Sequence, residues 1–390
     1  MSMMGRLFKN NIRQYGMVIA LAFIMGLFQI TTQGIMFKPM NVTNLVLQNS
    51  YVLILAIGML LIIITGGIDL SVGSVAAFVG AVSAVFMVDH NMPVQYAMLI
   101  GVLIGALAGA FQGYFIAFLR IPAFIVTLGG MLIFRGFTMA MLQGQTKAPF
   151  AKSFQALAAG YLPFMDLRWG SLNVIALGTG VLLSVILAAV MLNSRRNKKK
   201  YHFEVIPLWL DIAKIVVITV GINLLTYKFA GYNGLPIILI ILVALILIYT
   251  FVTQRTIAGR HIYALGGNEK AARLSGVKTD MVKFWVYVNM GVLSAIAGLI
   301  VAGRLNAATP KAGTGFELDA IGACFIGGAS TSGGIGTVMG TIVGGFVMAV
   351  LNNGMSIMGV SVDWQQSIKG FVLLGAVCFD FYTKSRSQSK

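Results

Sequence analysis

The sequence has few of the residues that build soluble domains, disulfides or metal sites. Of its 390 residues only 11 are Asp or Glu, and charged residues of both signs make up 10% of the chain, whereas soluble globular domains average about 25%. Cys324 and Cys378 both lie in apolar stretches, so we interpret them as small core residues and expect no disulfide. The histidines are far apart and match no metal-ligand spacing; they are His90, His202 and His261. We therefore expect no cofactor on this chain.

The chain also lacks the sequence signatures of nucleotide hydrolysis and catalysis. No G-x-x-x-x-G-K-[ST] phosphate loop occurs, and the glycine-rich stretch Gly333–Gly336 contains no lysine. We identify no nucleophile–base pair and no paired-carboxylate site. The sequence thus predicts that the chain is not an enzyme. If ATP drives its function, we expect the ATP to be hydrolysed on a separate subunit.

Apolar residues, by contrast, are abundant. Hydrophobic residues make up 58% of the chain and the mean hydropathy is +0.89. Segments near 20 residues recur along its length, which is what a helix needs to cross a bilayer core about 30 Å thick. We identify twelve such segments: Gly16–Phe37, Leu45–Thr65, Leu70–Val88, Val94–Leu119, Ala123–Leu142, Leu172–Leu192, Val205–Tyr227, Leu235–Val252, Val282–Val301, Leu318–Ala329, Ile335–Leu351 and Ile368–Phe381.

These segments predict an all-α fold. The expected architecture is a polytopic membrane protein with about 10–12 transmembrane helices, some of them broken or half-length. They form a single transmembrane domain over residues 1–390.

The net charge of +17 comes from basic residues that are unevenly placed between the segments. If the N-terminus lies inside, the inner connections carry 18 Lys and Arg and the outer connections carry 8. By the positive-inside rule, both termini and residues 253–283 are predicted to be cytoplasmic. The basic excess therefore does not predict a nucleic-acid partner.

A polar run, Thr253–Lys283, separates two of the apolar segments. Within it, Asn268 is predicted to cap a short helix, because its side-chain carbonyl can accept a free N–H of the first turn. Glu269 follows at the positive end of the helix dipole, and Gly276 is predicted to end the helix in a left-handed conformation. Two interpretations remain open from spacing alone. The run is a basic loop that only sets topology, or its short helix contacts another protein.

The residues of this run carry a family resemblance. Glu269-x-Ala271-Ala272-x-x-x-Gly276 resembles the E-A-A-x-x-x-G coupling motif of ABC importer permeases, and the pattern from Gly259 to Asn268, GRHIYALGGN, is similar to their sugar-importer branch. In that branch the short helix docks in a groove of the ATPase subunit. The resemblance implies an ATPase-coupling role for these residues: Gly259, Arg260, Gly266, Gly267, Asn268, Glu269, Ala271, Ala272 and Gly276.

A glycine-rich segment, Gly66–Ser74, joins two apolar segments with almost no loop and contains the carboxylate Asp69. One interpretation makes Asp69 a helix N-cap beside Ser71, exposed to cytoplasmic water. The other interpretation makes this glycine-rich segment a broken helix that lines a polar cavity, where membrane proteins tolerate irregular backbone. The two interpretations are compatible.

The spacing Gly-Gly-x-x-x-Ser-x-Gly in Gly66–Ser74 recurs at Gly327–Gly334, directly after a segment of twelve residues. Such a segment makes a helix of about 18 Å, too short to span alone. Paired interruptions in a transporter indicate its central pathway, although 46 of 390 residues are glycine and chance can produce a match this short. The predicted translocation path or gate comprises Gly66, Gly67, Asp69, Ser71, Gly73, Asp319, Gly327, Gly328 and Ser332.

Three smaller patterns predict contacts. Glycines at every fourth position, Gly101–Gly113, predict close helix packing rather than a pore. Arg135, deep in an apolar segment, is predicted to bind a carbonyl of a neighbouring broken helix or to extend outward to the interface. Asp211 and Lys214 are three residues apart, and we interpret them as a local ion pair.

The resemblance covers most of the chain, including Leu45–Ser83 and Leu351–Gly354, but not Leu172–Tyr227. Ribose-type permeases lack the two apolar segments found there, so residues 172–230 are predicted to be an extra helix pair, as in the longer xylose and multiple-monosaccharide permeases.

The resemblance implies a type II ABC importer-like permease subunit that moves a monosaccharide, of the xylose type or several sugars, into the cytoplasm across the bacterial plasma (inner) membrane. It further implies a homodimer, an ABC ATPase inside and an extracytoplasmic sugar-binding protein outside. The alternative is an ion- or proton-coupled secondary transporter. That class usually carries several intramembrane carboxylates, and here only Asp69 and Asp319 are candidates.

Overall fold

The structure is a computed structural model that describes residues 3–162, 167–203, 205 and 207–388. It is a helical bundle with one two-residue ribbon, in which β1 (Arg168–Trp169) pairs antiparallel with β2 (Leu172–Asn173). The helices are α1 (Met3–Thr31), α2 (Pro39–Ile64), α3 (Val72–Ala84) continued by the π-helical turn η1 (Val85–Asp89), α4 (Val94–Ala117), α5 (Ala123–Leu142), α6 (Lys152–Ala159), α7 (Val174–Lys200), α8 (Leu208–Ala230), α9 (Ile237–Arg255), α10 (Ile257–Gly267), α11 (Glu269–Leu274), α12 (Thr279–Leu305), α13 (Phe316–Ile326), α14 (Val338–Ile357) and α15 (Val362–Gln388).

All twelve predicted segments contain a helix, which confirms the all-α, polytopic fold. Within the described residues, nine helices are long and apolar enough to cross a membrane; they are α2, α3 with η1, α4, α5, α7, α8, α9, α12 and α14. The predicted short segment is also present, because α13 has only 11 residues. At 1.5 Å per residue it extends about 16 Å, roughly half of a bilayer core.

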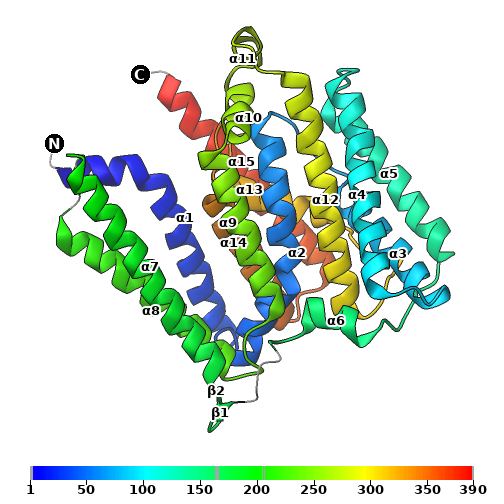
Figure 1. Ribbon diagram of the computed structural model, residues 1–390, viewed down its shortest axis with the longest axis horizontal. Helices are drawn as coiled ribbons and strands as arrows, with labels where there is room; N and C mark the ends of the chain where they lie inside the picture. The colour runs from blue at the N-terminus through cyan, green and yellow to red at the C-terminus, as the bar shows by residue number, and fades with distance from the viewer. Residues whose placement is uncertain (1–2, 163–166, 204, 206, 389–390) are drawn as a thin grey trace.

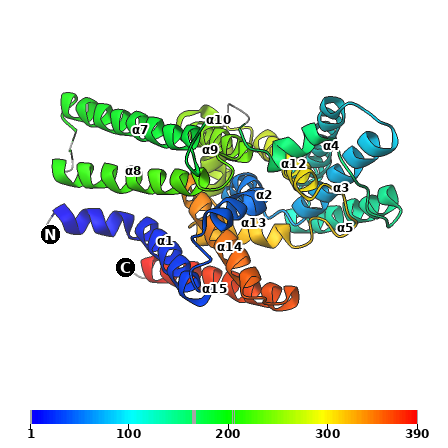
Figure 2. The same ribbon diagram turned by 90° about the horizontal axis from the view of Figure 1, so that it is seen from below.

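Helix α2 forms the centre of the bundle and is almost wholly buried. Figure 2 shows it with α13 in the middle, α3, α4 and α5 on one side and α7 and α8 on the other. Its residues Val52–Ile64 are an unbroken apolar run. Because every face of α2 meets protein, this run has no polar face, as expected for a fully buried helix. Cys324 of α13 packs in the same core, whereas Cys378 is exposed on α15, so interpreting Cys378 as a core residue was wrong.

The close contact between α4 and α12 depends on glycines, which carry no side chain. A Cβ atom on Gly105 would lie 2.5 Å from the carbonyl oxygen of Gly291, and one on Gly109 would overlap the carbonyl oxygen of Tyr287. Since neither position has room for a methyl group, the four-residue glycine spacing lets the two backbones touch. This confirms the predicted packing role of the spacing.

Helices α7 and α8 pack mainly against each other and extend away from the bundle (Figures 1 and 2). Asp211 of α8 pairs with Arg195 of α7. The predicted local pair of Asp211 with Lys214 is therefore wrong, because the partner helix offers a guanidinium to the same carboxylate.

The bundle has two different ends (Figure 1). Helices α10 and α11 lie at one end, which we call the α11 end. The start of α1 and the end of α15 lie toward the same end. Helix α6 and the β1–β2 ribbon lie at the opposite end, which we call the α6 end.

Candidate functional site

Helix α11 is built by local capping bonds. The side-chain oxygen of Asn268 accepts the amide of Ala271 at 3.0 Å. At the other end Gly276 is left-handed, with φ of +86°. The amides of Gly276 and Val277 donate back to carbonyls of the last turn at 3.0 and 3.1 Å, which is the bonding of a Schellman stop. Both the predicted cap and the predicted stop are confirmed.

Two ion pairs fasten α11 to the beginning of α12. The ammonium of Lys283 lies 2.8 Å from both carboxylate oxygens of Glu269. Arg273 lies 2.7 Å from Asp280. Exposed pairs of this kind contribute little to stability, about 0–1 kcal/mol each. Their geometric effect is larger, because they connect both ends of α11 to the first two turns of α12.

The outer face of α11 is exposed at the far tip of the molecule (Figure 1). Ala272 is buried against the rest of the protein, whereas Ala271 is exposed and Leu274 is 90% exposed. An exposed leucine among charged residues provides apolar area that a partner can bury. Leu274 was not predicted as a functional residue. An apolar residue between basic Arg273 and the helix stop at Gly276 could have indicated a contact site.

Helix α10 precedes α11 and was not predicted from the sequence. It begins at Thr256, whose hydroxyl oxygen accepts the Gly259 amide at 3.2 Å. A Cβ atom on Gly259 would overlap the carbonyl oxygens of Val252 and Thr253. Gly259 therefore permits the tight turn from α9 into α10. Arg260 is exposed on the same helix.

The end of α10 meets both predicted helix interruptions at what we call the glycine junction, formed by Ile64–Gly67, Gly266–Gly267 and Gly333–Gly336. A Cβ atom on Gly266 would overlap the carbonyl oxygen of Ile64 and lie 2.7 Å from the amide nitrogen of Gly334. That amide in turn donates to the Ile64 carbonyl at 2.9 Å. Three segments far apart in sequence thus touch through backbone atoms.

Tyr263 adds a side-chain bond to this junction. Its hydroxyl donates to the carbonyl oxygen of Gly336 at 2.6 Å, and burial raises the pKa of that hydroxyl above its usual value. A tyrosine hydroxyl is protonated near neutral pH even at its usual pKa of about 10, so it is a donor here. Because Tyr263 belongs to α10, the bond holds α10 to the segment that leads into α14.

The two interrupted helices end in the same way, with a register that differs from the predicted one. Gly66 has φ of +81° and Gly328 has φ of +83°. In each case the next amide donates back to the last turn, from Gly67 to Ile62 at 3.0 Å and from Ala329 to Cys324 at 2.9 Å.

The repeated spacing had paired Gly66 with Gly327, whereas the backbone conformations pair Gly66 with Gly328. Gly327 instead provides close packing, since a Cβ atom there would lie 2.5 Å from the carbonyl oxygen of Gly340. Ser332 is exposed in the loop that follows, with its hydroxyl 3.2 Å from that of Ser330.

Asp69 lies in a buried polar cluster at the start of α3. It is 3% exposed, and its carboxylate accepts both the amide and the hydroxyl of Ser71, at 2.8 and 2.7 Å. Gln112 of α4 donates to the Ser71 hydroxyl at 2.7 Å. The interpretation of Asp69 as a water-exposed N-cap was wrong, because Ser71 occupies the N-cap position of α3 and Asp69 is buried. Gln112 was missed, although it is an amide within a long apolar segment.

The start of α3 also contacts the loop that precedes α13. A Cβ atom on Gly73 would overlap the carbonyl oxygen of Gly313 and lie 2.7 Å from a carboxylate oxygen of Glu317. Arg135 of α5 donates to the carbonyl of Ala312 in that loop at 2.7 Å. Of the two alternatives for Arg135, binding a backbone carbonyl fits the structure, but the carbonyl belongs to the loop between α12 and α13 rather than to a broken helix.

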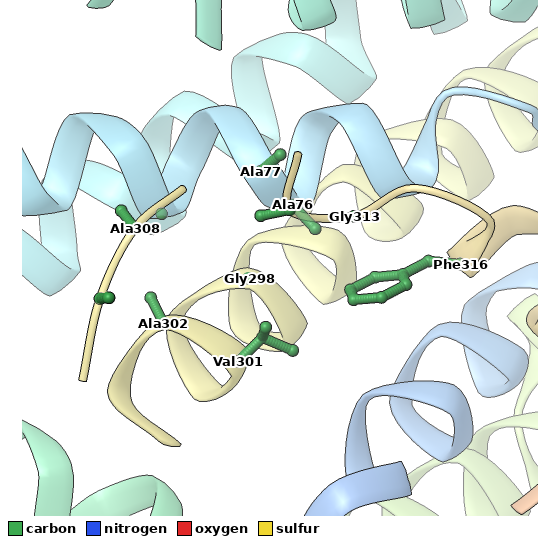
Figure 3. A pocket seen from close by; sticks show the side chains of 11 residues that line it. Ala76, Ala77, Gly298, Val301, Ala302, Ala308, Gly313 and Phe316 are labelled. Carbon is green, nitrogen blue, oxygen red and sulfur yellow. The ribbon is translucent and has the colours of Figure 1, made fainter. Parts of the chain in front are cut away.

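A small cavity lies next to this contact, between α3 and α12. Figure 3 shows the ring of Phe316 at one end and small side chains such as Ala76 and Ala302 along the walls. Its volume is about 10 Å³, room for about one water molecule. This cavity therefore has no room for a solute larger than water.

A larger polar cavity, about 330 Å³, opens at the α11 end. It is lined by Gly66 and Gly67 on one side and by Glu269 and Lys283 on the other. Tyr287 also lines it; the residue is 2% exposed, and its hydroxyl has no hydrogen-bond partner among the described residues. The cavity connects the ion pair beneath α11 with the first helix interruption. Tyr287 was missed, because nothing in the apolar segment that contains it marks it out.

Asp319 lies apart from these cavities, in a buried ion pair. It is 1% exposed, and its carboxylate lies 2.9 Å from the ammonium of Lys369 on α15. The hydroxyl of Tyr51 on α2 donates to the same carboxylate at 3.0 Å. The pair ties the half-length helix α13 to α15.

The chain matches a family of permease components, described as those of branched-chain amino acid transport systems, over residues 41–377. It belongs to this family and is a multi-pass membrane permease, a transport subunit rather than an enzyme.

The chain is 37% identical to the xylose transport system permease protein of Haemophilus influenzae over 98% of this chain and 100% of that protein. It is 37% identical to the corresponding Escherichia coli K12 protein over 97% and 94%. The ribose import permease protein of Bacillus subtilis is 34% identical over 88% and 85%. These matches confirm the resemblance to monosaccharide permeases of ABC importers. No solved structure matches the chain.

Proposed function

We propose that this chain is the permease subunit of an ABC importer that carries a monosaccharide, of the xylose type, into the cytoplasm. The observation that supports this most directly is the glycine junction. There the helix that leads into α11 touches the ends of both interrupted segments. The full-length similarity to xylose permeases supports the substrate class.

The proposed assembly places ATPase subunits on the α11 end. The exposed face of α11 docks into the ATPase, with Leu274 buried in the contact. The basic residues of the α11 end support a cytoplasmic location for it, by the positive-inside rule. A sugar-binding protein docks on the α6 end, and a second copy of the chain completes the path along a two-fold axis.

The proposed mechanism is alternating access driven by ATP. When the ATPase subunits close, they displace α11. The ion pairs Glu269–Lys283 and Arg273–Asp280 carry this displacement into α12, and the glycine junction carries it into the end of α2 and the segment before α14. The broken segments at Gly66–Gly73 and Gly327–Ser332 then open or close the path.

Reconstitution into vesicles tests this proposal against the secondary-transporter alternative. The permease is incorporated with its ATPase subunit, and the sugar-binding protein loaded with radiolabelled xylose is added on the other side. Uptake is expected to require both ATP on the ATPase side and the binding protein. Xylose uptake driven by a proton or sodium gradient, without ATP or the binding protein, would contradict the proposal.

A further inference from the structure

An apolar groove of about 740 Å³ lies between α9 and α12, closed at the α11 end by α10. Ile248 and Val252 of α9 form one wall, and Met281 and Trp285 of α12 form the other. Trp285 is 59% exposed. Both walls are helices long and apolar enough to span the membrane. The groove therefore opens sideways toward the hydrocarbon of the bilayer.

The closed end of the groove is basic. Lys278 and His261 line it there, next to Gly276. The nearby carboxylates are already paired, Glu269 with Lys283 and Asp280 with Arg273. Among the described residues no ion pair involves Lys278, so its charge is available to a ligand. Lys278, the residue that precedes α12, and Trp285 of α12 are seven residues apart, about 10 Å along the helix axis. A cation, an interfacial tryptophan and an apolar channel thus follow one another along one helix face.

We propose that this groove binds one anionic phospholipid. An acyl chain lies along α12 beside Trp285 and Met281, and the headgroup phosphate lies at Lys278 and His261. The charge of Lys278 favours an anionic headgroup over a zwitterionic one, as in other basic pockets between transmembrane helices. The headgroup would lie against Gly276, at the end of α11. The proposal rests on the membrane location and on these residues, and it is independent of the transported sugar.

Tryptophan quenching tests the proposal directly. In a Trp169→Phe, Trp209→Phe, Trp364→Phe background, Trp285 is the remaining tryptophan of the four in the chain. The full-length protein is reconstituted in phosphatidylcholine vesicles with increasing fractions of brominated phosphatidylglycerol or brominated phosphatidylcholine. Brominated phosphatidylglycerol is expected to quench Trp285 with an apparent affinity about fivefold higher, the ratio that one basic residue provides near an anionic headgroup.

Two charge variants identify the source of the preference. Lys278→Gln is expected to abolish it, whereas Lys270→Gln, which removes the same charge from an exposed position on α11 outside the groove, is expected to keep it. Equal quenching by the two lipids in the parent protein would overturn the proposal, since the groove would then hold bulk lipid. Absence of quenching by both lipids would overturn it as well, because another protein, such as a second copy, would cover Trp285.

Discussion

At Gly266 a hydrogen atom is the largest side chain that the glycine junction admits. The carbonyl oxygen of Ile64 and the amide of Gly334 occupy the space where a Cβ atom would lie. Backbone atoms cannot rotate away as a flexible side chain can. Gly267, the next residue, has no atom within 4 Å of its Cβ position and does not have positive φ. The two neighbouring glycines therefore provide a matched pair.

We predict that Gly266→Ala inserts into the membrane but loses transport, because α10 must move away from the ends of α2 and the segment before α14. Overpacking of this kind costs about 1–3 kcal/mol. Gly267→Ala is expected to behave like the parent. Thermal unfolding in detergent and ATP-driven uptake in vesicles measure both effects. If Gly266→Ala is as stable and as active as Gly267→Ala, the junction does not transmit motion.

Two substitutions at Asp69 distinguish the effect of its charge from the effect of its hydrogen bonds. Asn retains an oxygen that can accept from the amide and hydroxyl of Ser71, whereas Ala does not. We predict that Asp69→Asn assembles normally but transports more slowly if the carboxylate lines the path. Asp69→Ala should also lose about 1–3 kcal/mol of stability, because buried donors lose their acceptor. Uptake at the parent rate by the Asn variant would leave Asp69 with a structural role only.

Local rules predicted the residues whose partners are close in sequence. Asn268, three residues from its bonded amide, and Gly276, at the stop of a short helix, follow from capping rules alone. Gln112 did not, since its partner Ser71 is 41 residues away. Tyr263 belongs to the family pattern from Gly259 to Asn268, but its bond to a carbonyl 73 residues away could not be inferred from spacing. Such contacts depend on which helices become neighbours.

At the scale of elements, α11 carries the docking prediction. Leu274→Ser is expected to leave folding unchanged, within about 0.5 kcal/mol, because the side chain is exposed. It should reduce the amount of ATPase subunit that copurifies, since the apolar area for the contact is lost. Leu305→Ser makes the same change at the end of α12, where the side chain is also exposed, and should leave ATPase binding intact. Equal retention of ATPase by both variants would show that α11 is not the docking element.

Elements were predictable where one physical requirement sets their length. The bilayer thickness fixes the long apolar helices, and nine of the twelve predicted segments contain one within the described residues. Helix α10 was missed because it lies in a polar run, and only Gly259, Ile262 and Leu265 are buried within it. That three-residue spacing marks one helix face. The sequence does not show what this face packs against; in the structure it packs against the ends of α2 and α9.

At the scale of the whole molecule, the charge distribution predicts the orientation. An Asn197→Cys variant in a Cys378→Ser background, which removes the exposed native thiol, places a thiol in the basic end of α7. It should resist an impermeant maleimide in intact cells and react after permeabilisation. Lys152→Cys, exposed on α6 at the opposite end, should react in intact cells. The reverse pattern of labelling would invert the proposed orientation.

The buried pair of Asp319 and Lys369 has a consequence for biosynthesis. A ribosome adds Asp319 to the chain 50 residues before Lys369. Until α15 enters the bilayer, the carboxylate on α13 lacks Lys369, its ion-pair partner among the described residues, and an unpaired carboxylate in hydrocarbon is costly. The nascent bundle therefore cannot settle in its final form until its last helix arrives. A chain whose synthesis stops before Lys369 would therefore keep a buried carboxylate without the ammonium that pairs with it in the finished permease.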